Sequence, residues 1–168
     1  YFANFGDWIE AFNEMYRATN DLSYFRGSLK IVRAVIAYRD DNRNPQQHLR
    51  TGEVVPCWSS SLYSGGNGNE CYVVDTGLVL YPMFDMLLLA KDYPALKNEF
   101  QAGEYDSMIT TLTQSLEYHD PEYRHEPLSD EGRYVFTPRN LSDYQYWGGE
   151  HSQPFNWSSS LGRPFWIS

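Results

Sequence analysis

A carboxylate at the start of a predicted helix is the first candidate for chemistry in this sequence. Asp75 lies in the segment 72–77 (YVVDTG), which leads into a long apolar stretch. The helix dipole and free N–H groups stabilise a carboxylate at a helix N-terminus. In a cleft, Asp75 would act as a base or bind sugar hydroxyls, and Tyr72 would be the proton donor. The alternative is plain N-capping by Asp75 or Thr76.

His119 is the second catalytic candidate because it ends a predicted helix, where an imidazolium is electrostatically favourable. The alternative for His119 is a purely structural helix end. Most glycosidases use a pair of carboxylates as their catalytic residues. Asp40 and Asp120 also lie at helix–loop junctions, so each is a candidate partner for Asp75.

Asp85 interrupts an apolar helical stripe. A buried carboxylate needs a partner, because an unpaired charge is costly inside a protein. We therefore expect a structural bond from Asp85 to Arg39, to Arg50 or to a Tyr hydroxyl, in preference to a catalytic role.

Aromatic residues are frequent, with 14 Tyr, 9 Phe and 5 Trp in 168 residues. Rings with polar tips suit half-buried clefts, and sugar-binding surfaces use them for stacking. Five residues of the predicted loops are candidates for substrate binding: Trp58, Tyr63, Tyr146, Trp147 and Asn156. The alternative is that the rings pin the loops onto the helices. For Asn156, the alternatives are a helix cap and a glycan acceptor.

Two cysteines and two sequons favour an oxidising compartment. Cys57 and Cys71 flank a stretch rich in Gly, Ser and Asn, and a disulfide between them would contribute about 3 kcal/mol by chain entropy. No CxxC spacing accompanies them, so we predict no metal site. The sequons at Asn140 and Asn156 are candidate glycosylation sites. We therefore expect a secreted or extracellular protein, with a periplasmic location as the alternative.

Composition also limits the partners. The net charge of −9 argues against nucleic acid and anionic membranes, which require clustered Lys and Arg. The longest apolar stretch, 78–90, is interrupted by Pro82 and Asp85 and is typical of a buried helix. No motif calls for a cofactor. The length fits one domain over 1–168, and both ends of the sequence suggest a processed or partial chain of a longer protein.

Helical periodicity predicts the elements that must position these residues. Apolar stripes over 5–16 and 25–36 predict two helices joined by a short turn at 19–21. A third helix is expected to start near Thr76, with Pro82 in its first turn or at a kink. A short helix over 94–100 and another over 105–116 follow, and a new helix is predicted to begin at Trp157.

Two long irregular stretches, 39–75 and 120–155, separate the helical hairpins. Short strands are expected at 53–58 and 71–74, as a loose hairpin pinned by the cysteines. The two hairpins end in similar triplets, Tyr38-Arg39-Asp40 and Tyr118-His119-Asp120, 80 residues apart. This layout favours a hairpin repeat. The predicted fold class is therefore mainly α, with helical hairpins, long irregular loops and at most a short β-hairpin.

The chain resembles the α/α-toroid proteins of carbohydrate metabolism, the six-hairpin glycosidases and the toroidal polysaccharide lyases. The resemblance rests on three phrases, which stand at 11–21 (AFNEMYRATND), at 72–77 (YVVDTG) and at 154–163 (PFNWSSSLGR). It covers most of the predicted helical residues and implies an incomplete α/α toroid. Such proteins commonly place substrate in a cleft at one end of the barrel, lined by the loops between hairpins.

The resemblance favours a secreted domain that acts on or binds a polysaccharide; as an enzyme it would be a glycoside hydrolase or a polysaccharide lyase. A non-catalytic extracellular scaffold with a toroid-like fold is the main alternative. In that case the partners would be further hairpins of the same protein or other copies of it. A cytosolic helical interaction module is the third alternative, and it requires Cys57 and Cys71 to be reduced and far apart.

Overall fold

The computed structural model describes residues 2–43, 47–48, 52–61, 68–128, 131–136, 151–152, 160–161 and 164. The α-helices are α1 (Phe2–Thr19), α2 (Leu22–Ala37), α3 (Val73–Asp92) and α4 (Glu104–Glu117). Two 3₁₀ helices are η1 (Pro94–Glu99) and η2 (Asp120–Glu122). The strands are β1 (Tyr123–Glu126), β2 (Glu131–Phe136) and β3 (His151–Ser152). The predicted fold class, mainly α with a short β-hairpin, is confirmed.

The turn between α1 and α2 forms where the sequence predicts it. Asn20 adopts a left-handed conformation with φ 54°, which Asn tolerates better than most residues. Asp21 is the N-cap of α2 and accepts a hydrogen bond from the Ser23 backbone N–H at 2.9 Å. That bond stabilises the ionised carboxylate and lowers the pKa of Asp21.

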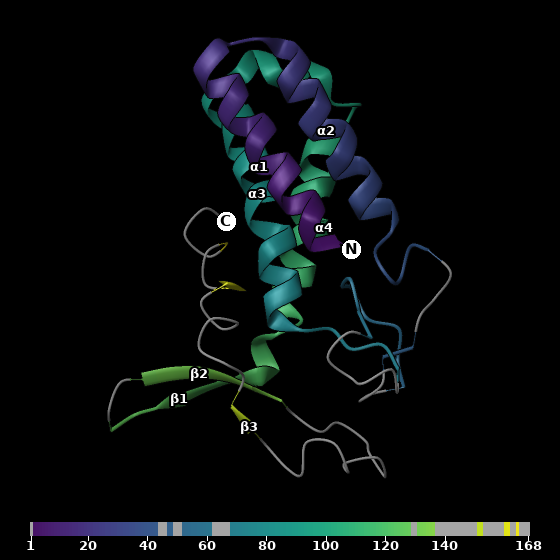
Figure 1. Cartoon of the computed structure of the whole chain (residues 1–168), viewed down its shortest axis with the longest axis vertical. Helices are drawn as coiled ribbons and strands as arrows, with labels where there is room; N and C mark the ends of the chain where they lie inside the picture. The colour runs from purple at the N-terminus through teal and green to yellow at the C-terminus, as the bar shows by residue number, and fades with distance from the viewer. Residues whose placement is uncertain are drawn as a thin grey trace.

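The two hairpins, α1–α2 and α3–α4, lie side by side in the same orientation. Asn13 on α1 donates to Asp85 on α3, 72 positions later. Arg33 on α2 bonds Glu104 on α4, 71 positions later, and Arg39, two residues beyond the end of α2, bonds Ser115 on α4, 76 positions later. The difference in residue number between bonded residues stays between 71 and 76 along the helices, which happens only when two helices run in the same direction. α1 therefore runs parallel to α3, and α2 runs parallel to α4 (Figure 1).

The α3 helix is the core helix of the described structure. It is apolar on nearly all sides and mostly buried, which its sequence requires because no polar face could meet solvent. By length and composition it is the one candidate membrane span among the described residues, but 78% of its most apolar window is buried inside the protein. Burial to that extent is typical of a core helix.

The start of α3 differs from the sequence prediction. The helix begins at Val73, three residues before Thr76, so the strand predicted at 71–74 is wrong. Among the described residues, the predicted loose hairpin is represented by an antiparallel bridge between Ser60 and Glu70, which exchange backbone hydrogen bonds of 2.8 and 2.9 Å. Pro82 lies in the interior of α3 and not in its first turn. Valines favour strands, but here burial against other helices overrides that preference.

The second irregular stretch contains a β-hairpin that the sequence analysis missed. β1 pairs antiparallel with β2, in the register Tyr123↔Tyr134 and Glu126↔Glu131, and β3 pairs with the far end of β2. Figure 1 shows β1 and β2 beyond the end of α4, away from the helical turns. These strands are short and rich in charged residues, so they carry little of the apolar alternation that identifies a strand.

Asp85 finds different partners from those expected. Arg17 donates to both of its carboxylate oxygens, and Asn13 Nδ2 donates to Oδ2 at 2.9 Å. Asn13 is fully buried and also bonds the Pro82 carbonyl and the Ser28 hydroxyl. The structural role predicted for Asp85 is therefore confirmed, but the predicted partner Arg39 is wrong, and Arg50 lies outside the described residues.

Two glycines mark where successive helices approach most closely. A Cβ on Gly6 would lie 2.4 Å from the Leu78 carbonyl oxygen of α3. A Cβ on Gly77 would lie 2.3 Å from the carbonyl of Ser160, which with Leu161 is helical and follows the predicted helix start at Trp157. Trp157 itself lies outside the described residues. Gly6 therefore lies in the contact of α1 with α3, and Gly77 lies in the contact of α3 with the next helical segment.

Gly6→Ala is expected to destabilise the fold by about 1–3 kcal/mol, because the added methyl group meets backbone that must shift. Gly27→Ala is the matched control. It also lies inside a helix, where Ala is favoured by up to about 1 kcal/mol, and its Cβ would meet only the partly exposed Phe12 ring at 3.3 Å. Urea unfolding measures both variants. Equal stabilities would contradict the close packing of α1 on α3.

Candidate functional site

The candidate site lies at the end of the molecule that carries the long connections. α2 and α4 both end there, with Tyr38 and Tyr118 as their C-caps, and α3 begins there with Tyr72 as its N-cap (Figure 1). The matching triplets at 38–40 and 118–120 thus occupy equivalent helix ends. We call this end the loop end.

A disulfide joins Cys57 to Cys71 at the centre of the loop end. Their Cα atoms are 6.2 Å apart, within the usual range for a disulfide, and both residues are fully buried. The sulfurs pack with Val55 and Tyr118 in a small apolar cluster of their own. The predicted bond is confirmed, and it is consistent with an oxidising environment.

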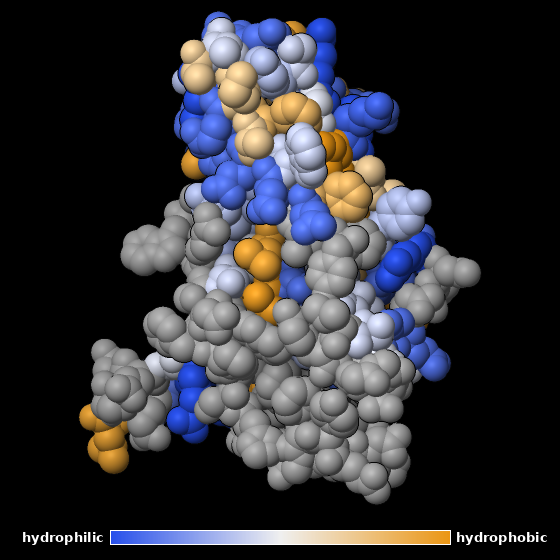
Figure 2. Space-filling model, viewed as in Figure 1, coloured by the Kyte–Doolittle hydropathy of each residue, from blue (hydrophilic) through white to orange (hydrophobic). Residues whose placement is uncertain are grey.

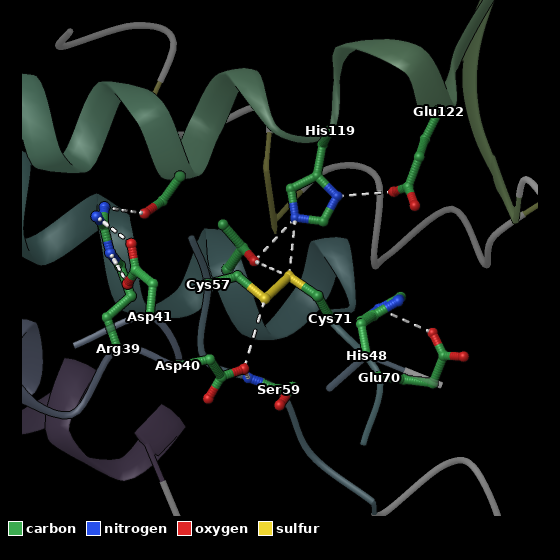
Figure 3. The surroundings of a disulfide bond; sticks show 12 residues. Arg39, Asp40, Asp41, His48, Cys57, Ser59, Glu70, Cys71, His119 and Glu122 are labelled. Atoms are coloured by element: carbon green, nitrogen blue, oxygen red, sulfur yellow. Dashed lines mark hydrogen bonds and ion pairs between the residues drawn. A yellow bond between two sulfur atoms is a disulfide. The ribbon is translucent and has the colours of Figure 1, made fainter. Parts of the chain in front are cut away.

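Three side chains form a hydrogen-bonded relay beside this disulfide (Figure 3). His119 Nδ1 lies 2.7 Å from Glu122 Oε2, and His119 Nε2 lies 2.9 Å from Thr76 Oγ1. An ionised carboxylate only accepts, so Nδ1–H donates to Glu122, and in the neutral ring Nε2 accepts from the Thr76 hydroxyl. His119 Nε2 is also 3.7 Å from the sulfur of Cys71. The relay therefore ties the end of α4 to the first turns of α3.

Asp40 anchors the other side of the disulfide. Its backbone N–H donates to the Cys57 carbonyl at 2.9 Å, and its Oδ2 accepts from the Ser59 N–H at 2.8 Å. Arg43 donates to Oδ1 at 2.8 Å. The carboxylate is fully buried. Because Asp40 serves these structural bonds, it is not a good candidate for the second catalytic carboxylate.

A second buried histidine lies in the first long loop. His48 Nε2 is 3.1 Å from the Glu70 carboxylate, and both residues are about 1% exposed. Glu70 also shares the backbone bridge with Ser60, so the pair holds the two sides of this loop together. The sequence analysis missed Glu70 and Glu122. Only the spacing of three between His119 and Glu122 gave a signal, since side chains three apart meet on helical turns.

Asp75 has no side-chain hydrogen bond or ion pair among the described residues, whereas Asp40, Glu70 and Glu122 at this end each have a side-chain partner. It is the third residue of α3 and not the N-cap, so the predicted capping role is wrong; Tyr72 is the N-cap and makes no side-chain capping bond. Asp75 is 7% exposed, and its Oδ2 has no hydrogen-bond partner among the described residues. Loss of water around the charge raises the pKa of Asp75 to about 6.

The three predicted catalytic residues lie near the first turn of α3. Tyr72 and Asp75 belong to that end of the helix, and His119 bonds Thr76, the neighbour of Asp75. Tyr72 and His119 are buried to 1% and 0% exposure. His119 is held by its two hydrogen bonds, so the direct acid–base candidate is Asp75. Within the part of the chain that the structure describes, no group of His, Cys, Asp or Glu has the arrangement of a metal site.

The predicted sugar-binding ring of Trp58 takes the alternative role of pinning the loop. Its side chain is 1% exposed, and its indole N–H donates to the Val35 carbonyl of α2 at 2.7 Å. A stacking platform requires an exposed face, which Trp58 does not offer here. Tyr63, Tyr146, Trp147, Asn140 and Asn156 lie outside the described residues.

No family model, no curated protein and no solved structure matches this chain.

Asp75→Asn is expected to change how stability depends on pH. The folded pKa of about 6 lies above the ordinary 3.8, so the folded state binds the proton more tightly. The contribution of Asp75 to stability is therefore fully present below about pH 4 and is lost as pH rises through 6, by about 3 kcal/mol in total. Asn has no proton to lose, so the variant should gain stability relative to the wild type across this window.

Urea unfolding at several pH values tests this expectation. Asp92→Asn is the control, because Asp92 is an exposed aspartate at the other end of α3. A difference between wild type and Asp75→Asn that is constant from pH 4 to above pH 6 would contradict the raised pKa.

Proposed function

We propose that this chain is part of a secreted α/α-toroid protein whose loop end binds and cleaves a polysaccharide, with Asp75 as the catalytic acid or base. The observation that carries the proposal is Asp75 itself. It is a buried carboxylate with one oxygen unpartnered among the described residues, at the end where the long loops gather. An unpaired buried carboxylate is costly, and such groups concentrate at functional sites.

The stacking of the hairpins supports the toroid part of the proposal. α1 packs on α3 in parallel through Gly6, and α3 packs through Gly77 on the helical residues Ser160 and Leu161. Parallel stacking of successive hairpins with a slowly varying offset is the arrangement from which both toroids and open α-solenoids are built. In either case all the long connections gather at one end, and Asp75 lies at that end.

The pKa of Asp75 supports the chemical part. A general acid or base works best when its pKa lies near the working pH, and a value of about 6 leaves both forms populated in mildly acidic surroundings. Glycoside hydrolysis needs a protonated carboxylic acid at the glycosidic oxygen, whereas a lyase needs a base to take a proton beside a carboxyl group. Asp75 is equipped for either step. Asp120, which is exposed at the start of η2, remains the second carboxylate to test.

The disulfide supports the location. A buried Cys57–Cys71 bond persists where no reducing system removes it, as outside the cell or in the periplasm. Glycosylation at Asn140 or Asn156 would agree with the same location. Tyr63, Tyr146 and Trp147 remain the aromatic candidates for sugar stacking on the loops.

A non-catalytic extracellular scaffold is the second candidate, and an apolar surface on α1 favours it. Trp8 is 62% exposed and Met15 is 40% exposed, and the Trp8 ring packs in a tilted arrangement against Phe12 of the same face, with the ring centroids 6.4 Å apart. In the space-filling view, pale and orange atoms of apolar residues lie among blue charged ones over α1 and α2 (Figure 2). Such a surface would bind further hairpins or other copies of the protein.

A screen against neutral and acidic polysaccharides tests the proposal directly. The intact protein should release reducing ends or unsaturated uronate ends from one class of polymer. Asp75→Asn should lose at least about 100-fold in turnover, as expected for removal of a general acid or base, and should still bind the polymer. Asp92→Asn, at the opposite end of the same helix, should keep full activity.

Full activity in Asp75→Asn would remove Asp75 from the mechanism. If the wild-type protein binds a polysaccharide without cleaving it, catalysis is excluded and the chain is a carbohydrate-binding domain. If no polysaccharide binds and the protein self-associates through a contact that Trp8→Glu abolishes, the scaffold is the correct assignment.

A further inference from the structure

The two sulfurs of the disulfide face surroundings of opposite electrical character. Cys71 faces His119, and Cys57 faces Asp40 on the other side of the bond (Figure 3). The distances are 3.7 Å from the Cys71 sulfur to His119 Nε2 and 4.0 Å from the Cys57 sulfur to Asp40 Oδ2. A disulfide itself carries no charge, so this asymmetry acts only once the bond is reduced.

Three features on the Cys71 side would stabilise a thiolate there. His119 can take up a proton on Nε2, and Glu122, 2.7 Å from Nδ1, would stabilise the resulting imidazolium. The Thr76 hydroxyl is 3.6 Å from the same sulfur and can donate to it. Cys71 also directly precedes Tyr72, the N-cap of a 20-residue helix, where the helix dipole favours negative charge.

The Cys57 side would disfavour a thiolate. A carboxylate near a thiol repels the thiolate, and Asp40 is fully buried, where such repulsion is less screened than in water. Arg43 offsets part of this charge through its bond to the far oxygen, Oδ1. Asp40 Oδ2, the oxygen nearest the sulfur, accepts from the Ser59 N–H and is free to accept from a Cys57 thiol as well.

Other charged groups around the bond are already paired with one another. His48 and Glu70 form their own pair, and Arg39 is bound to Asp41. Tyr118, in the apolar cluster around the sulfurs, is a neutral neighbour. The groups that face the two sulfurs directly are therefore His119 with Glu122 on one side and Asp40 with Arg43 on the other.

We propose that reduction of Cys57–Cys71 turns Cys71 into a nucleophilic thiolate beside His119, a latent modification site for soft electrophiles, while Cys57 remains a neutral thiol. The arrangement is a thiol, an imidazole and a carboxylate in series, the order in which a cysteine nucleophile is activated. This inference does not depend on the proposed action on polysaccharides.

The exchange that releases Cys71 requires an external dithiol. One of its thiolates attacks the Cys57 sulfur, the bond between the two sulfurs breaks, and Cys71 leaves as the thiolate. The second thiol of the reductant loses a proton and displaces Cys57, which takes up a proton. The reductant ends as a cyclic disulfide, and both cysteines are reduced by the two electrons it supplies. Attack on Cys57 is favoured because the sulfur with the more stable thiolate leaves faster.

Burial of the bond sets the condition for this chemistry. Both cysteines are 0% exposed, so a reagent reaches them only when the first long loop lifts from the helices. Among the described residues, the Asp40 bonds and the indole bond of Trp58 also hold that loop to the end of α2. Reduction removes the covalent tether and therefore also eases access to Cys71.

The first experiment uses the wild-type protein reduced with a dithiol under native conditions. A short pulse of iodoacetamide at neutral pH, followed by peptide mapping, should label Cys71 faster than Cys57, on the order of tenfold or more. Equal labelling, or faster labelling of Cys57, would overturn the proposal.

Two single-cysteine variants remove any dependence on access. Cys57→Ser leaves Cys71 alone, and Cys71→Ser leaves Cys57 alone; ultraviolet thiolate absorbance against pH reports ionisation of each, while circular dichroism reports the fold. Cys71 should ionise about one pH unit or more below Cys57. Adding His119→Gln should raise the ionisation pH of Cys71 by about one unit and leave that of Cys57 unchanged.

Thr76→Val separates the contribution of the hydroxyl from that of the imidazole. It removes one donor to the sulfur but keeps the ring, so it should raise the ionisation pH of Cys71 by less than His119→Gln does. If His119→Gln unfolds, the comparison of the two single-cysteine variants still decides, because neither touches His119. Identical ionisation of Cys57 and Cys71 in those variants would refute the assignment.

Discussion

Asp85 joins the first helix of one hairpin to the first helix of the next. It accepts hydrogen bonds from Asn13 and from both ends of the Arg17 guanidinium fork. α3 is otherwise apolar on almost every side, so hydrophobic burial alone would permit it to slide or rotate against α1. A buried carboxylate whose partners lie at one level of the neighbouring helix removes that freedom, because any other register would leave the charge unpaired. Gly6 then permits the close approach that this register requires.

The parallel register has a direct consequence for the chemistry. Because α1 runs with α3 and α2 runs with α4, the start of α3 and the ends of α2 and α4 all lie at the loop end. The loop end is rich in buried polar side chains. Asp40, His48, Glu70, His119 and Glu122 are all at most 2% exposed. Each of the five has a hydrogen-bonding or ion-pair partner, as buried polar groups generally must.

Asp75 stands apart from this pattern. One of its oxygens has no hydrogen-bond partner among the described residues, although the side chain is 7% exposed. The fold can hold such a group because α3 is anchored elsewhere, by Asp85 and by the packing of its apolar side chains. Burial removes water from around the charge, and this raises the pKa of Asp75. The burial of Asp75 destabilises the fold, and the other contacts of α3 offset that cost. Such a balance is typical of functional residues.

Local sequence determined most of the helical architecture. The stripes over 5–16, 25–36 and 105–116 predicted α1, α2 and α4, because hydrophobic periodicity acts within a few residues. The Cys57–Cys71 bond and the structural role of Asp85 also followed from residue type alone. The start of α3 could not be predicted from local sequence, because its valines fit a strand equally well. Only burial between helices selects the helical form.

Only the tertiary structure decided which residues meet. Arg17 pairs with Asp85 across 68 positions, and Thr76 meets His119 across 43, so no local pattern could indicate either contact. The same holds for Trp58. Its residue type is compatible with stacking on a sugar and with pinning a loop, and only its hydrogen bond to the Val35 carbonyl distinguishes the two roles. It holds also for Asp75, for which the sequence allows a catalytic carboxylate or an N-cap, whereas the structure buries it in the first turn of α3 with Oδ2 unpartnered among the described residues. Hydrogen bonding and desolvation depend on the neighbours that folding brings together, and those neighbours are distant in the chain.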